Sequence, residues 1–323
     1  HLSFKKKFNN QGKQGIAGIV SFKDQPITYK LSQYINHIIR HEATIMNSLT
    51  KMMNYCPHFC KFLGLCSTTV NGNYKKLDNP FNVTCKHPIT IDTLLMEYVE
   101  GKKLYTLIKN NSISDDIIFS TIKQLLFAIS IAQDKAKFTH YDLHSCNVLL
   151  KKCDPDTVFL YIMDNDNQFC VPTFGYYPVI IDFGLSINFD QISKVISSKQ
   201  KLTPAAEKLL SDKFYVFAPD YYLWCIEIHT ICYLLDSSSN IIDDNSIKLI
   251  CIEYVENNKA FKMFDSDFIQ RYTDSCIKFL SQYKGKTRDK VIISLLDFHH
   301  TWDNFSISIM YLKLLFNIFK FQT

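Results

Sequence analysis

Two short segments in the middle of the chain carry side chains that could act on phosphate. The first spans residues 140–147, reads His-Tyr-Asp-Leu-His-Ser-Cys-Asn, and precedes the apolar run Val-Leu-Leu. The second places Asp182 at the end of an apolar run and directly before Phe-Gly. In both, polar side chains follow or precede β-type residues, so they are expected on tight loops at the ends of strands.

Phosphoryl transfer needs side chains of these types. A carboxylate must orient the acceptor hydroxyl and take its proton, and oxygen ligands must hold magnesium on the phosphates. Asp142 suits the first role, as the catalytic residue, and Asn147 and Asp182 suit the second, as metal ligands. Each of the three could instead cap a turn or a helix, but capping does not explain the whole set.

The two segments resemble the catalytic loop H-R-D-L-x-x-x-N and the metal loop D-F-G of the protein kinase superfamily. Asp142 and Asn147 match the first motif, and Asp182, Phe183 and Gly184 match the second. The motifs occur in the family's order, which is far more specific than either one alone. The resemblance implies an α+β, two-lobed protein-kinase-like fold, with a small β-rich lobe and a larger helical lobe that together bind ATP and Mg²⁺.

Weaker matches lie upstream. Gly12, Gly15 and Gly18 resemble the glycine loop that covers the phosphates, although their spacing departs from G-x-G-x-x-G. Lys30 matches the strand lysine that contacts the α- and β-phosphates, and Glu42 matches the helix glutamate that pairs with it. The alternatives are an ordinary hairpin, an exposed strand lysine and a solvated glutamate.

The segment Leu-Leu-Met-Glu-Tyr-Val-Glu-Gly at 94–101 resembles the hinge between the two lobes of the family. In the family an extended hinge presents backbone groups to adenine. The resemblance therefore implies that Met96 flanks the base and that the backbone of Glu97 and Val99 bonds to it. An ordinary buried strand is the alternative.

A buried aspartate is expected to hold the catalytic loop from a helix of the large lobe. Two sequences fit this role, one beginning at Asp220 and the other containing Asp303. The position of Asp220 after Asp182 agrees better with the family, so Asp220 is the predicted anchor. The alternative for Asp220 is a plain helix cap.

Two substitutions distinguish the chain from most of the family. Tyr141 replaces an arginine that pairs with a phosphorylated activation loop, which makes switching by such phosphorylation doubtful. His144, a further candidate catalytic residue, replaces the lysine that steadies the transferring phosphate. A histidine there is similar to small-molecule kinases of the aminoglycoside and choline type, and to divergent kinases of large DNA viruses. We predict a serine/threonine protein kinase, with a small-molecule kinase and a catalytically inactive scaffold as alternatives.

The surrounding sequence predicts the elements that position these residues. Residues 1–99 form the expected small lobe, with a helix over 32–52, and residues 100–323 form the large one. The stretch 153–177 alternates β-type runs around a turn and predicts an inserted hairpin. Apolar spacing predicts the remaining regular elements: strands at 59–66 and 91–99, and helices at 103–110, 115–135, 221–235 and 305–320.

Composition limits the other functional classes. The net charge is only +5, so no nucleic-acid partner is expected. No apolar run predicts a membrane span, and 11 cysteines without a signal peptide favour an intracellular, reducing compartment, which is the host cytoplasm or the virion if the protein is viral. Zinc is a minor alternative, since the Cys/His groups near residues 56–66 and 140–146 each lack a second ligand pair. The protein substrate and the oligomeric state are not predictable.

Overall fold

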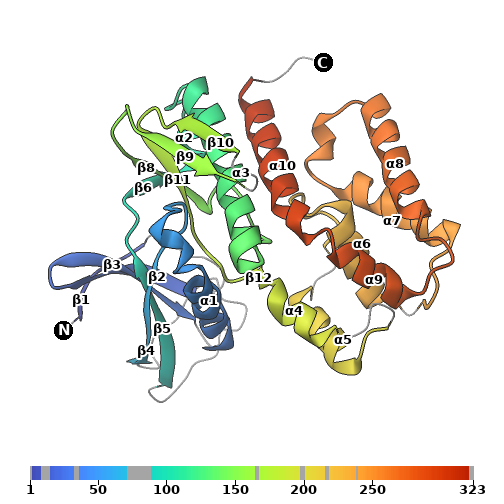
Figure 1. Ribbon diagram of the computed structural model, residues 1–323, viewed down its shortest axis with the longest axis horizontal. Coiled ribbons are helices and arrows are strands. Elements are labelled where there is room, and N and C mark those ends of the chain that lie inside the picture. The colour runs from blue at the N-terminus through green and yellow to red at the C-terminus, as the bar shows by residue number, and fades with distance from the viewer. Residues whose placement is uncertain are drawn as a thin grey trace. The chain divides into compact units, whose positions relative to one another are not determined.

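The computed structural model describes residues 2–8, 15–32, 36–70, 89–163, 167–196, 201–214, 218–237 and 239–319. The chain divides into two compact units. The first comprises His1–Gly101 and Pro178–Gly184, and the second comprises Lys102–Tyr177 and Leu185–Thr323. The first contains a β-sheet and the second is larger and mostly helical, which confirms the predicted α+β class (Figure 1).

An antiparallel sheet forms the framework of the first unit. Its strand order is β1-β2-β3-β5-β4, and the strands are β1 (Leu2–Lys7), β2 (Gly15–Phe22), β3 (Gln25–Ser32), β4 (Phe62–Val70) and β5 (Ile89–Glu97). A two-residue turn joins β2 to β3, with Lys23 and Asp24 at φ angles of 48° and 62°. Left-handed turns of this kind match the twist of paired strands. In this order β3 is hydrogen-bonded to β2 on one edge and to β5 on the other, which fixes the backbone from which its side chains project.

Helix α1 (Asn36–Leu49) packs against β3, β4 and β5. It buries Ile39, Ile45, Met46 and Leu49, which recur at helical spacing and form one apolar face. The short 3-10 helix η1 (Met52–Asn54) follows. The helix predicted over 32–52 is therefore confirmed in its central part.

Helices dominate the second unit. The N-terminus of α3 is capped as expected, because the Ser114 hydroxyl accepts a hydrogen bond from the Ile117 N–H. The helices are α2 (Leu104–Lys109), α3 (Asp115–Ala136), α4 (Phe189–Val195), α5 (Pro204–Lys213), α6 (Ile226–Asp236), α7 (Asp244–Asn257), the 3-10 helix η3 (Phe261–Met263), α8 (Ser266–Ser281), α9 (Arg288–Leu296) and α10 (His299–Phe319).

Short strands complete the fold. One sheet has the order β11-β8-β6, with β6 (Gly101–Lys103), β8 (Val148–Lys152) and β11 (Tyr176–Ile180). Strand β7 (Phe138–Thr139) pairs with β12 (Ile187–Asn188). The predicted inserted hairpin is confirmed as the antiparallel pair β9 (Val158–Ile162) and β10 (Gln168–Pro172). The rings of Tyr161 and Phe169 pack on Phe127 of α3, with centroids 4.7 and 5.0 Å apart.

Two predicted helix boundaries need correction. The helix predicted over 221–235 begins at Ile226, because the residues before it form turns in which Tyr221 donates to Ala218 and Trp224 donates to Tyr221. The helix predicted over 305–320 begins earlier, at His299. Both differences bear on the candidate site, since the turns before α6 and the first turns of α10 contact the 140–147 segment.

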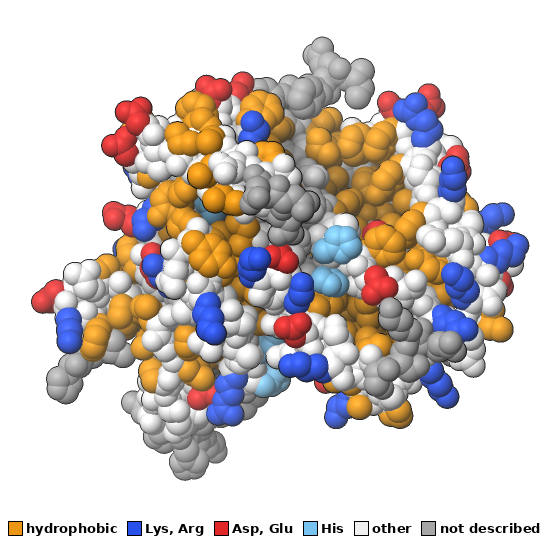
Figure 2. Space-filling model, in the orientation of Figure 1, with side chains coloured by type: hydrophobic (Ala, Val, Ile, Leu, Met, Phe, Trp, Pro, Cys, Tyr) orange, Lys and Arg blue, Asp and Glu red, His pale blue; other side chains and the backbone are white. Residues whose placement is uncertain are grey.

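Hydrophobic side chains remain exposed on both units. In the second unit they include Leu249 and Ile252 of α7 and Leu312 of α10. Figure 2 shows hydrophobic side chains in the region where Figure 1 draws α8 and α10. None of the helices in the described ranges combines the length and hydrophobicity needed to cross a bilayer.

Gly18 and Gly64 offer a matched test of sheet packing in the first unit. A Cβ atom on Gly18 would lie 2.4 Å from the Lys6 carbonyl oxygen and 2.7 Å from the Tyr29 ring, whereas one on Gly64 would meet nothing within 4 Å. Overpacking of this kind costs about 1–3 kcal/mol. We expect Gly18→Ala to lower the thermal unfolding midpoint, measured by circular dichroism, and Gly64→Ala to leave it unchanged or raise it. Equal midpoints for wild type and Gly18→Ala would contradict the described β1–β2–β3 packing.

Candidate functional site

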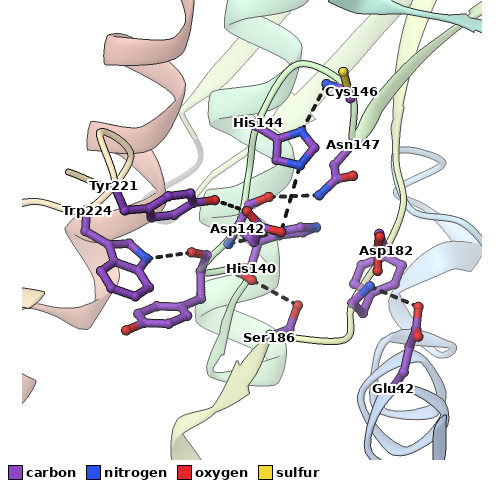
Figure 3. A network of polar contacts seen from close by, with 12 residues as sticks. Glu42, His140, Asp142, His144, Cys146, Asn147, Asp182, Ser186, Tyr221 and Trp224 are labelled. Carbon is purple, nitrogen blue, oxygen red and sulfur yellow. Dashed lines mark hydrogen bonds and ion pairs between the residues drawn. The ribbon is translucent and has the colours of Figure 1, made fainter. Parts of the chain in front are cut away.

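The first unit brings together three predicted site residues that are far apart in the sequence. The Lys30 ammonium of β3 lies 2.8 Å from Glu42 Oε2 of α1 and 2.7 Å from Asp182 Oδ1. The second carboxylate oxygen of Glu42 accepts a hydrogen bond from the Phe183 N–H at 3.2 Å. One buried glutamate therefore fixes the strand lysine. It also fixes the loop that carries Asp182 (Figure 3).

Charge and burial act in opposite directions on this group. Burial alone would lower the pKa of Lys30, but the adjacent carboxylates of Glu42 and Asp182 outweigh it and raise the pKa above its ordinary value. Burial raises the pKa of Glu42, and the Lys30 ammonium partly offsets that shift. The Asp182 side chain is 45% exposed, against 1% for Glu42. Asp182 is thus the carboxylate that a ligand from solvent could reach.

A short backbone pairing holds Asp182 in the first unit. The Ile180 N–H donates to the His58 carbonyl at 2.7 Å, and the Cys60 N–H donates to the Ile180 carbonyl at 3.0 Å. The His58 ring bonds the Pro178 carbonyl at 2.9 Å through Nδ1, and burial lowers the pKa of His58 to about 4. A neutral, buried histidine thus ties the strand before Asp182 to the sheet side of the unit.

Asp182 itself has a left-handed backbone, with φ of 67°. Non-glycine residues rarely adopt this conformation, and it costs of order 1–3 kcal/mol unless the surroundings impose it. Here the bond from Lys30, the Glu42–Phe183 bond and the buried Phe183 ring next to Phe59 hold it in place. Such strained positions concentrate at functional sites.

The other residues predicted to bind nucleotide also lie in the first unit. Gly12 falls outside the described residues, Gly15 begins β2, and Gly18 pairs with Tyr29 inside the sheet. Met96 and Glu97 end β5, and the Glu97 N–H donates to the Lys61 carbonyl at 2.9 Å. Val99 follows the strand and is buried.

The predicted catalytic loop lies in the second unit and also contains a left-handed residue. Tyr141 has φ of 68°. Its backbone is held from both sides, since the Tyr141 N–H donates to Asp303 Oδ1 at 3.1 Å and Trp224 Nε1 donates to the Tyr141 carbonyl at 3.0 Å. The neighbouring His140 N–H donates to Asp303 Oδ2 at 2.7 Å. Both carboxylate oxygens of Asp303 are therefore used to position this loop.

The prediction that Asp220 anchors this loop is wrong. Asp220 is about half exposed and pairs with Lys259 at 2.7 Å. The anchor is Asp303, the alternative in the sequence, which is completely buried in α10. The indole of Trp224, a few residues after Asp220, supplies a second contact from the turns before α6. Sequence order favoured Asp220, but only the packing of α10 shows which aspartate reaches the loop.

Tyr141 offers an apolar contact where the resemblance expects an arginine. Its ring is buried, stacks on Trp224 with centroids 4.8 Å apart, and meets Phe214 edge-on at 5.6 Å. A guanidinium that could pair with a phosphorylated loop is therefore replaced by an aromatic cluster. Whether phosphorylation of the loop switches the site stays a prediction from the sequence, which makes such switching doubtful.

The polar side chains of the loop contact one another and the loop's own backbone (Figure 3). The Asn147 amide nitrogen donates to the Asp142 carbonyl at 3.0 Å. His144 Nε2 lies 3.9 Å from Asp142 Oδ2, and His144 Nδ1 accepts the Cys146 N–H at 3.2 Å. The His144 contact and the charge of Lys103 lower the pKa of the Cys146 thiol.

The Tyr221 hydroxyl donates to Asp142 Oδ1, a contact that the sequence did not indicate. Tyr221 lies in the turns before α6, far from the loop in sequence. Within the part of the chain that the structure describes, no three His, Cys, Asp or Glu side chains are grouped closely enough to hold a metal ion by themselves. The zinc clusters considered from the sequence are therefore not assembled among these residues.

The architecture, an α+β chain with a β-sheet region and a larger helical region, is consistent with a two-lobed kinase-like fold. No protein-family model matches the chain. It is similar to an uncharacterized protein, 098R, of Invertebrate iridescent virus 6, with 35% identity over 205 residues that cover 51% of this chain and 34% of that protein.

Two proteins of Invertebrate iridescent virus 3 are also similar. Uncharacterized protein 038R is 29% identical over 57% of this chain and 35% of its own length. A protein named probable kinase 098L is 29% identical over 57% of this chain and 32% of its own length. The chain thus spans about a third of the length of these curated relatives. These three relatives are viral, and a further one, uncharacterized protein ZK177.2 of Caenorhabditis elegans, is 27% identical over 56% of this chain and 58% of its own length.

Asp303 and Asp220 provide a matched pair of substitutions in the second unit. Asp303→Ala leaves two buried N–H groups without their acceptor, which should cost about 2–4 kcal/mol of unfolding free energy. Asp220→Ala removes only an exposed ion pair and should cost less than about 1 kcal/mol. Both tryptophans of the chain, Trp224 and Trp302, lie in the second unit, so urea unfolding followed by tryptophan fluorescence reports it directly. Similar losses for the two variants would show that Asp303 does not anchor the loop.

Proposed function

We propose that this chain is an ATP- and magnesium-dependent protein kinase that transfers the γ-phosphate of ATP to serine or threonine hydroxyls. The observation that carries the proposal is the Lys30 ammonium bonded to both Glu42 and Asp182. In phosphoryl transfer a lysine held by a buried glutamate contacts the phosphates, and an adjacent aspartate binds the magnesium that neutralises them. The name of one relative, probable kinase 098L, supports the same class of activity.

The residues present fit a magnesium ion. Magnesium is usually held by one or two carboxylates together with waters and the substrate's phosphates, so it does not require a closed protein cage. Asp182 supplies a partly exposed carboxylate. The Asn147 amide donates through its nitrogen to the Asp142 carbonyl, which directs its oxygen away from that bond. Asp182 and Asn147 would hold the ion, whose positive charge stabilises the transferring phosphate.

The remaining nucleotide contacts follow the same proposal. Lys30 would contact the α- and β-phosphates. Gly12, Gly15 and Gly18 would cover the phosphates, where glycine lets backbone N–H groups approach closely. Adenine would bond to the backbone of Glu97 and Val99, which end and follow β5, with Met96 beside it.

Asp142 is the proposed catalytic carboxylate on the acceptor side. Its side chain is 19% exposed, and Oδ1 accepts the Tyr221 hydroxyl, so Asp142 would accept the proton of an acceptor hydroxyl through its other oxygen.

The cysteines that the structure describes are free thiols. We accordingly place the protein in a reducing compartment, the host cytoplasm or the virion of a large DNA virus.

A small-molecule kinase is the second candidate. His144 favours it, because its Nε2 atom lies near Asp142 Oδ2, where the resemblance to protein kinases expects a lysine. Radiolabelled ATP offered with generic protein acceptors, and separately with an aminoglycoside and choline panel, distinguishes the two. Labelled protein supports the first proposal, and label confined to the small molecules overturns it in favour of the second. A magnesium-dependent thermal shift with ATP, without turnover on any acceptor, would indicate a scaffold.

Replacement of Asp142 tests its assigned role. Asp142→Asn keeps the size of the side chain but removes the proton acceptor, so we expect phosphate transfer to fall by about 10²–10⁴-fold while ATP affinity, measured by calorimetry, stays near that of wild type. Asp156→Asn is the matched control, because Asp156 is an exposed carboxylate in the turn before β9. Full transfer by Asp142→Asn would rule out the role.

A further inference from the structure

The two carboxylate oxygens of Asp142 have different surroundings. Oδ1 accepts a hydrogen bond from the Tyr221 hydroxyl, and Oδ2 faces His144 Nε2 at 3.9 Å. Figure 3 shows Tyr221 and His144 approaching the carboxylate from different sides. A hydroxyl that donates to Oδ1 fixes the plane of the carboxylate, and so fixes the direction in which Oδ2 presents its lone pairs.

Tyr221 is itself held in place by the cluster that supports the loop. Its ring meets Trp224 edge-on with centroids 4.9 Å apart, and its N–H donates to the Ala218 carbonyl at 3.0 Å. Trp224 in turn is 8% exposed and donates through Nε1 to the carbonyl of left-handed Tyr141. The same indole therefore positions both the backbone of the loop and the tyrosine that bonds its carboxylate. Such pre-organised donors limit the motion of a catalytic group before substrate binds.

We propose that Tyr221 is a positioning residue for the transfer reaction, which leaves Oδ2 of Asp142 as the oxygen that receives the acceptor's proton. This inference rests on the proposed kinase function. In the step, the acceptor oxygen forms a bond to the γ-phosphorus of ATP while the bond from that phosphorus to the bridging oxygen breaks and releases ADP. The hydroxyl proton passes to Oδ2 and then to solvent. Hydrogen bonds to an ionised group are roughly twice as strong as neutral ones, so the Tyr221 contact can hold the carboxylate through this step.

Tyr221 could instead be an acceptor, since its hydroxyl occupies a place beside Asp142 that a substrate hydroxyl would need. One observation and one electrostatic argument favour the positioning role. The ring is packed against Trp224, and a phosphate on Tyr221 would place about −1.5 to −2 charges beside the Asp142 carboxylate. Phosphotyrosine at this position is therefore an outcome that would overturn the proposal.

Tyr221→Phe and Tyr105→Phe test the proposal as a matched pair. Tyr105 of α2 is exposed, and its ring contacts the Lys109 ammonium 5.6 Å from the centroid, a contact that does not need the hydroxyl. We expect Tyr221→Phe to lower kcat by about 10-fold or more, with the KM for ATP unchanged. Tyr105→Phe should keep near wild-type kcat. In the Asp142→Asn background, Tyr221→Phe should have no further effect on the residual rate.

Three results would overturn the positioning role: unchanged kcat in Tyr221→Phe, the same fold-loss with and without Asp142, or phosphate on Tyr221 in the wild-type protein by mass spectrometry. A second readout does not depend on turnover. If Tyr221 holds Asp142, the effects of Tyr221→Phe and Asp142→Ala on urea unfolding should be non-additive, because alanine removes the accepting oxygen, and strict additivity would also overturn the proposal. Wild-type protein that transfers phosphate to no acceptor would overturn the kinase function, while this stability cycle would still decide whether the contact exists.

Discussion

The two ion pairs of the Lys30 ammonium, one with Glu42 and one with Asp182, are the interactions on which this part of the candidate site depends. A buried glutamate near a sheet is unfavourable unless a cation and hydrogen-bond donors compensate it. Glu42 uses one oxygen for Lys30 and the other for the Phe183 N–H. This arrangement joins a strand, a helix and a distant loop in one unit, and leaves Asp182 as the carboxylate partly open to solvent. Removal of Lys30 would leave the buried Glu42 carboxylate without its cation.

Each unit has a predicted functional loop with a left-handed non-glycine residue, and each of these loops is held by residues outside it. Asp182 is restrained by bonds from Lys30 and around Phe183. Tyr141 is restrained by Asp303 on its N–H side and Trp224 on its carbonyl side. Strain of this kind persists only where the surrounding structure imposes it. In each case the restraint comes from a residue distant in sequence, so the folded units, not the loops alone, determine the conformation.

The sequence was most informative where local pattern and chemistry coincide. The helix over 32–52 and the hairpin within 153–177 follow from periodicity, because apolar spacing reflects the face that each element buries. The motifs around Asp142 and Asp182 indicated loops beside strands, as the structure has them. The pairing of Lys30 with Glu42 was suggested only by resemblance, and the structure brings the two together.

The sequence was least informative where contacts join distant segments. Nothing near Asp303 distinguishes it from Asp220 as an anchor, because the choice depends on how α10 packs. The Tyr221 contact had no local signal either, since it arises from the turns that delay the start of α6. Single-residue roles that depend on long-range packing therefore require coordinates.

The proposed role of Asp182, which Lys30 fixes, is to bind the magnesium that supports phosphate transfer from ATP. The most direct test is the rate of transfer of radiolabelled γ-phosphate to acceptors, with and without magnesium, for wild type, Asp182→Ala and the exposed control Asp190→Ala. We expect magnesium-dependent transfer by wild type and Asp190→Ala, and loss of transfer at all magnesium concentrations in Asp182→Ala. Equal, magnesium-dependent transfer by Asp182→Ala and wild type would contradict it.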